Sequence, residues 1–104
     1  MAQYFSRNRQ PISSLAMEGA RINNQIILVG VNESYPVAKG VFFIEYFTAA
    51  AGTTVAIADG EGRQIVAAVS AFANDRSPLR CDYGITVTGN LAILKGYFVE
   101  SVFE

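Results

Sequence analysis

Short apolar runs separated by turn-forming residues fill the chain after residue 24. These runs are rich in Val, Ile, Phe, Tyr and Thr, which favour β-strands, and they do not alternate with helical segments. The pattern predicts an all-β fold: an antiparallel β-sandwich of jelly-roll-like form, or a small barrel, with about six or seven strands. The predicted strands cover residues 25–31, 41–48, 53–59, 63–70, 84–88 and 91–99, with a short extra strand at 79–83.

Two of these runs are apolar on both faces. The sequence QIILVGV at 25–31 has the composition of a buried strand. The run at 41–48 is equally apolar, so we expect it to be central in the sheet or covered by the N-terminal segment. Strict alternation would place Val41, Phe43, Glu45 and Phe47 on one face, with Phe42, Ile44 and Tyr46 on the other.

A three-residue turn is predicted between the strands at 53–59 and 63–70. The sequence Asp59-Gly60-Glu61-Gly62 fits a type I turn followed by a bulge, which pairs Asp59 with Arg63 and sets Ile57 opposite Ile65. Gly62 then takes the position that requires a positive φ.

A second turn is predicted at Gly89-Asn90. Gly at the first central position is typical of a type II′ turn, and threonine-rich and apolar runs flank it. This hairpin would set Ile85 opposite Leu94.

Composition changes near residue 24, which divides the chain into an N-terminal arm (1–24) and a β-body (25–104). The arm has three Arg and one acid, and a helical turn is predicted at 14–18 that ends at Gly19. A disordered tail is the alternative. However, the arm is apolar enough to pack on a neighbour. Its predicted partner-binding residues are Tyr4, Phe5, Arg7, Arg9, Ile12, Leu15 and Arg21.

The C-terminal segment stays apolar to its last residues. Tyr97, Val102 and Phe103 either complete a long last strand or contact another subunit. The low charged content, 16% against about 25% in typical domains, favours a surface that is partly covered by another protein.

The residue inventory opposes catalysis and metal binding. The chain has no His and one Cys, so it lacks the commonest general base and a disulfide. Cys81 has the character of a small buried hydrophobe, and Glu45 is the acid most open to a raised pKa on burial. We predict no catalytic residues, no metal site and no cofactor. We also predict no membrane span, because Glu45 interrupts the most apolar window.

Residues 53–104 resemble small structural proteins of tailed-phage virions, of the capsid decoration or cement type. The resemblance is carried by the hairpin built on ADGEGR at 58–63 and by GITVTGNLAIL at 84–94. It implies a homo-oligomer on the capsid surface whose arm grips the major capsid protein. It also implies a protein made in the host cytoplasm and located in the virion.

The function predicted from these observations is therefore non-enzymatic: a decoration protein that stabilises a capsid through its arm and β-body. One alternative is a glycan- or receptor-binding module of a phage tail, with Tyr35, Tyr46 and Tyr83 as stacking faces. Another is a single-stranded nucleic-acid binder using Phe42, Tyr46 and Phe72. The body carries five basic and eight acidic residues, which opposes nucleic-acid binding.

Overall fold

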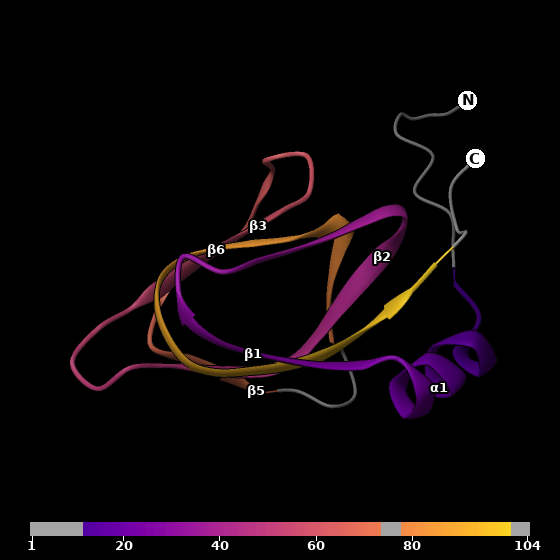
Figure 1. Cartoon of the computed structure of the whole chain (residues 1–104), viewed down its shortest axis with the longest axis horizontal. Helices are drawn as coiled ribbons and strands as arrows, with labels where there is room; N and C mark the ends of the chain where they lie inside the picture. Colours follow the sequence, from indigo (N-terminus) through magenta and orange to yellow (C-terminus); the bar gives the residue numbers. More distant parts are fainter. Residues whose placement is uncertain (1–11, 74–77, 101–104) are drawn as a thin grey trace.

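The computed structural model describes residues 12–73 and 78–100, which form one helix and one curled sheet (Figure 1). All six strands belong to this sheet, and the pairing is mostly antiparallel, which confirms the predicted all-β class. The sheet curls into a half-barrel. The elements are α1 (Ser14–Asn23), β1 (Gln25–Val31), β2 (Ser34–Ala49), β3 (Val55–Asp59), β4 (Gln64–Val69), β5 (Ala71–Ala73) and β6 (Leu79–Val99).

Strand β6 is the centre of the sheet, because β1, β2 and β3 all pair with it. Along one edge of β6, residues 90–97 pair with β1 and residues 84–86 with the start of β2. Along its other edge, residues 91–99 pair with the end of β2 and residues 85–89 with β3. Partner numbers in β6 fall as those in β2 rise, so the paired segments run in opposite directions. Residues 79–82 pair with β2 again, which curls the sheet.

The predicted hairpin at Gly89-Asn90 is wrong, because β6 continues through these residues as one strand. Ile85 lies opposite Asp59 of β3, and Leu94 lies opposite Leu28 of β1. Both halves of the sequence thus pair with other strands instead of with each other. Gly89 has φ +123°, so the glycine allows a bend within the strand rather than a chain reversal.

The predicted turn between β3 and β4 is confirmed. The Asp59 N–H donates to the Arg63 carbonyl at 2.9 Å, and Gly62 has φ +87°. The register beyond the turn differs, because Ile57 lies opposite Val66 instead of Ile65 and the ladder shifts at that point.

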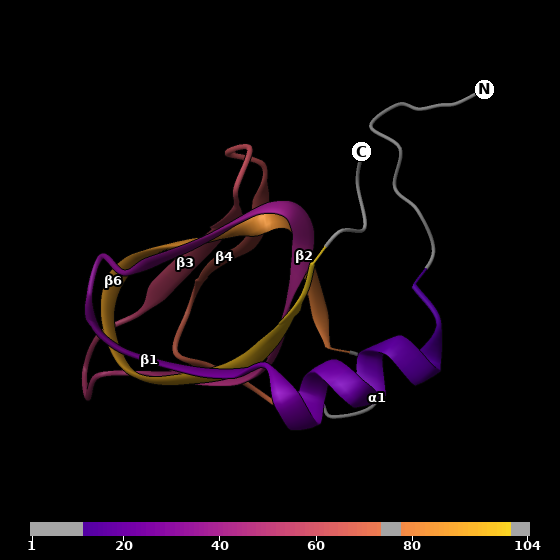
Figure 2. The same ribbon diagram turned by 45° about the vertical axis from the view of Figure 1, so that its right-hand side comes forward.

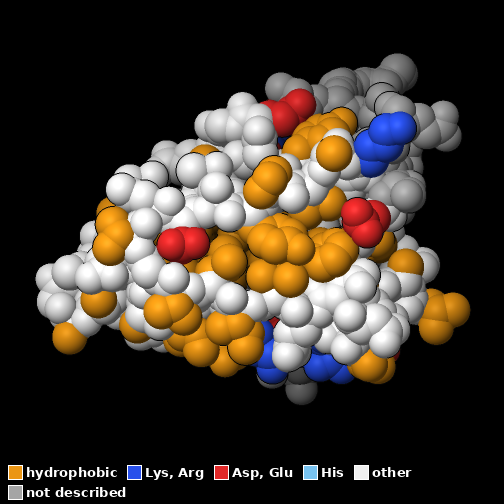
Figure 3. All heavy atoms as spheres, viewed as in Figure 1, with side chains coloured by type: hydrophobic (Ala, Val, Ile, Leu, Met, Phe, Trp, Pro, Cys, Tyr) orange, Lys and Arg blue, Asp and Glu red, His pale blue; other side chains and the backbone are white. Residues whose placement is uncertain are grey.

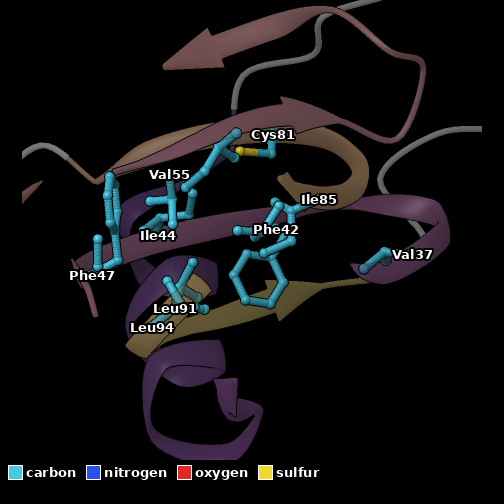
Figure 4. Packing of buried hydrophobic residues seen from close by; sticks show 12 residues of the cluster. Val37, Phe42, Ile44, Phe47, Val55, Cys81, Ile85, Leu91 and Leu94 are labelled. Atoms are coloured by element: carbon cyan, nitrogen blue, oxygen red, sulfur yellow. The ribbon is translucent and has the colours of Figure 1, made fainter. Parts of the chain in front are cut away.

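The first core fills the concave side of the curl (Figure 4). Side chains of β2, β3 and β6 point toward one another there, and the strand at 41–48 is central, as predicted. Phe47 was predicted to share a face with Phe43 and Glu45, but it packs in this core. The ladder shifts between Ile44 and Tyr46, which lie opposite Gly96 and Lys95, so Glu45 is an extra residue that reverses the alternation. The core includes Val37, Phe42, Ile44, Phe47, Val55, Cys81, Ile85, Leu91 and Leu94.

A second core lies between the sheet and α1, at one end of the curl (Figure 2). Val41, Phe43 and Tyr97 of the sheet pack there against Ala20 of the helix. Phe43 and Tyr97 stack with ring centroids 5.3 Å apart. The described part of the predicted arm is therefore packed on the body.

Helix α1 extends beyond its predicted end at Gly19 and stops at Asn23. Ser13 caps its start, with Oγ accepting from the Ala16 N–H at 3.1 Å. At its end, the Asn24 N–H donates to the Ala20 carbonyl at 2.7 Å, and the Asn24 amide donates to the Phe98 carbonyl at 3.2 Å. Packing of Ala20 and the link to β6 therefore outweigh the helix-ending tendency of Gly19.

Candidate interaction surface

Two buried aspartates lie where the β3–β4 turn meets the start of β6. Asp59 and Asp82 are 2% and 1% exposed. Arg63 Nε lies 3.3 Å from Asp59 Oδ2, and Arg80 Nε donates to Asp82 Oδ1 at 2.9 Å. The Asp59 carboxylate also accepts from the backbone N–H groups of Glu61 and Arg63. Arg63 Nη2 also lies 3.9 Å from Asp82 Oδ2, and the Gly60 N–H donates to the Asp82 carbonyl at 3.0 Å, so the cluster links the hairpin to β6 and has a structural role.

Glu45, the acid singled out in the sequence, is 5% exposed and lies beneath α1. Arg21 Nη1 lies 3.9 Å from its carboxylate, and Arg21 Nη2 donates to Glu18 at 2.6 Å. Burial raises the pKa of the Tyr97 hydroxyl, and the nearby negative charge of Glu45 raises it further. Arg21 opposes this effect on the Tyr97 pKa. Arg21 of the helix and Glu45 of the sheet thus attract each other across the contact between α1 and β2.

Neither cluster offers a metal centre: across residues 12–73 and 78–100, no three acidic or Cys side chains are grouped so that they could hold an ion. Helix α1, the helix of the described chain, falls short of the length and apolarity needed to span a membrane.

Large apolar side chains are exposed on two consecutive elements, α1 and β1. We call these five residues, Leu15, Ile22, Ile27, Val29 and Val31, the α1–β1 surface. Helix α1 contacts β1 and ends one residue before it, so the two elements that carry these side chains are neighbours (Figure 2). Their exposed fractions are 82% for Leu15, 70% for Ile22, 56% for Ile27 and 61% for both Val29 and Val31.

The alternation along β1 explains why three of these residues face outward. Ile26 and Leu28 pack against the first core, whereas Ile27, Val29 and Val31 point away from it. The sequence interpretation of 25–31 as a fully buried strand is therefore wrong. Burial on both faces requires a covering layer, and within the described residues β1 has the core on one face only.

Hydrophobic side chains also gather across the middle of the face seen down the curl, with acidic side chains to either side (Figure 3). Tyr35 and Phe98 are only partly buried and pack against the first core, with their ring centroids 5.7 Å apart. These two rings therefore belong to the first core.

The predicted partner-binding residues occupy different environments. Leu15 is exposed, and Arg21 is half-exposed on the same helix. Ile12 is partly buried in the second core, and Tyr97 is 2% exposed beneath α1, so neither contributes to the α1–β1 surface. The remaining predicted contacts lie outside the described residues: Tyr4, Phe5, Arg7, Arg9, Val102 and Phe103.

Sequence reasoning missed four members of the surface: Ile22, Ile27, Val29 and Val31. For Ile22 a signal existed, because it lies seven residues after Leu15 and two helical turns return to the same face. For β1 the sequence held no such signal, because every position except Gln25 and Gly30 is a large apolar residue.

The residues of the two alternative functions do not form a shared site. Tyr35 packs on Phe42 and Phe98 with centroids 5.7 Å apart, whereas Tyr83 packs against the second core. Phe42 has no exposed area, so its ring cannot stack on a base.

Comparison with protein-family models, with curated proteins and with solved structures gave no match.

Proposed function

We propose that this protein is a non-enzymatic assembly protein that binds a protein partner through the α1–β1 surface. The observation that carries the proposal is the exposure of five large apolar side chains on two adjacent elements. Large apolar side chains exposed on neighbouring elements of a small folded protein are typical of interaction sites.

The apolar area of the surface determines how much binding free energy it can supply. Its exposed fractions together equal about three fully exposed side chains, and burying each contributes about 1.5–3 kcal/mol. The sum of about 5–10 kcal/mol is similar to the roughly 4–15 kcal/mol that association costs. At about 25 cal/mol per Å² this corresponds to roughly 300 Å² of apolar area, against about 800 Å² per partner in a standard interface. Binding therefore also needs polar contacts.

We further propose that the partner assembly is a tailed-phage capsid, which makes the protein a decoration protein of virions. This part rests on the sequence resemblance of residues 53–104. The segment at 58–63 forms a hairpin turn, whereas 84–94 runs as one strand, so the proposal depends on the sequence resemblance alone.

The test is co-sedimentation of the full chain with purified tailed-phage capsids stripped of their own decoration protein. We expect the wild-type chain to bind, and L15E and I22E to bind at least about tenfold more weakly, because each places a charge on the apolar surface. A matched control is A16E, which adds the same charge to another exposed position of α1. Absence of wild-type binding would contradict the capsid setting, and full binding by L15E and I22E would contradict the surface.

A further inference from the structure

The described sheet has three strands with a free edge, and β1 differs from the other two. Strand β5 pairs with β2 alone and has three residues, and β4 pairs with β3 alone and exposes Gln64, Ala67 and Ala68. Short edges and edges with small or polar side chains resist pairing with other chains. Strand β1 has seven residues, no charge and no proline, and it exposes Ile27, Val29 and Val31. Its ladder with β6 shifts register between Leu28 and Gly30, but it carries no charged residue and no proline that would protect the free edge.

The backbone of β1 places its unused hydrogen-bonding groups beside these apolar side chains. At one end the Phe98 N–H donates to the Asn24 carbonyl, and at the other the Asn32 N–H donates to the Gly89 carbonyl. Even-numbered residues therefore face β6. Because successive residues of a strand point to opposite edges, the N–H and C=O groups of Ile27 and Val29 face away from β6. Within the described chain, β1 pairs with β6 alone.

We propose that the free edge of β1 pairs antiparallel with β1 of a second copy of this chain. The inference rests on the proposed function, because β1 forms part of the α1–β1 surface. It identifies the partner of β1 as a second copy of the chain. A two-fold axis at Leu28 sets Ile27 opposite Val29 of the second copy. Both side chains then stay on the outer face, because this register keeps odd residues opposite odd residues.

Charge supports the antiparallel arrangement. Lys95 lies opposite Ile27 near the start of β1. Glu33 follows the other end of β1. Antiparallel pairing brings the basic end of each copy to the acidic end of the other, whereas parallel pairing would bring like charges together. The seven-residue edge spans about 24 Å and supplies the backbone hydrogen bonds that the apolar side chains alone lack.

The first test is the solution mass of the full chain by light scattering, from low to high micromolar concentration. We expect a mass twice the 11.2 kDa of the monomer. V29P removes one N–H donor at the free edge in each copy and leaves the β6 edge intact. We therefore expect the dissociation constant of the dimer to rise about tenfold or more. V29K adds like charges near the axis and provides a second variant. The control is T88K, at an exposed position of β6, and circular dichroism checks that each variant is folded.

The second test is amide hydrogen exchange by NMR of the wild-type chain. In the dimer the Ile27 and Val29 amides exchange slowly, and they exchange faster as dilution favours the monomer. A wild-type monomer at all concentrations overturns the inference, and so does a dimer that V29P and V29K leave unchanged. A monomer whose Ile27 and Val29 amides are protected assigns the edge to another part of this chain.

The two proposals fail independently. A monomer that still binds capsids overturns the β1 pairing and leaves the assembly function in place. A dimer that binds no capsid overturns the capsid setting and supports the β1 pairing.

Discussion

Gly60 and Gly62 in the β3–β4 turn are constrained for different reasons. The sequence singles out Gly62, whereas the structure makes a side chain at Gly60 the more costly of the two. Gly62 has the positive φ that the turn requires, and a Cβ there would meet nothing within 4 Å. A Cβ on Gly60 would lie 2.1 Å from the Tyr83 carbonyl oxygen and 2.5 Å from its carbon. The substitution G60A therefore forces the turn away from β6.

The two costs can be worked out separately. Moving the turn breaks the 3.0 Å hydrogen bond from the Gly60 N–H to the Asp82 carbonyl, which contributes about 0.5–1.5 kcal/mol. Relief of the overlap adds about 1–3 kcal/mol, so G60A should lower the free energy of unfolding by about 2–4 kcal/mol. For G62A the left-handed backbone costs about 1–2 kcal/mol. Reduced freedom of the unfolded chain returns about 0.4–1 kcal/mol, which leaves about 1 kcal/mol.

Urea unfolding of wild type, G60A and G62A measures this difference, and thermal unfolding repeats it independently. A loss of 1 kcal/mol lowers the melting temperature of a domain this size by about 4–8 °C, so G60A should melt about 8–30 °C lower and G62A about 4–8 °C lower. Equal losses, or a larger loss for G62A, would show that the close contact between the turn and Tyr83 does not limit this position.

Two further predictions concern the second core. A20L inserts volume between α1 and the aromatic pair of Phe43 and Tyr97, so urea unfolding should show a loss of about 1–3 kcal/mol, whereas A16L at an exposed helix position should change stability little. The pKa of Tyr97 is raised in the fold above its ordinary value of 10.0, so the unfolded chain loses this proton first and stability falls as pH rises past about 10. Unfolding curves at about pH 9 and pH 11 should show a smaller decline for Y97F, and an equal decline would contradict the assignment.

Local chemistry predicted the parts of the fold that depend on neighbouring residues. The turn at 59–63 follows from its Asp and Gly positions, and the central place of 41–48 follows from apolar residues on both faces. The structure shows why both faces are apolar: Phe42 packs in the first core and Phe43 lies beneath α1. The bulge at Glu45 escaped prediction because it depends on how β2 meets β6.

Pairing between distant strands escaped prediction for a related reason. The sequence at 84–99 has the residues of a hairpin, but in the fold it pairs with β1, β2 and β3 over longer ladders. Which arrangement is more stable depends on the whole sheet rather than on Gly89 and Asn90. The same holds for the candidate surface: Leu15 was predicted as a contact, whereas the exposure of Val29 depends on what covers β1.

The central position of β6 has a consequence for synthesis of the chain. Strand β6 follows all the other strands in the sequence, yet β1 pairs with it alone within the described sheet, and β2 and β3 each lack one neighbour without it. On the ribosome, the apolar residues of β1 must therefore wait unpaired until residues 79–99 emerge. Pairs so distant in sequence form slowly, and during this delay the apolar residues at 25–31 stay exposed, which favours aggregation of the incomplete chain.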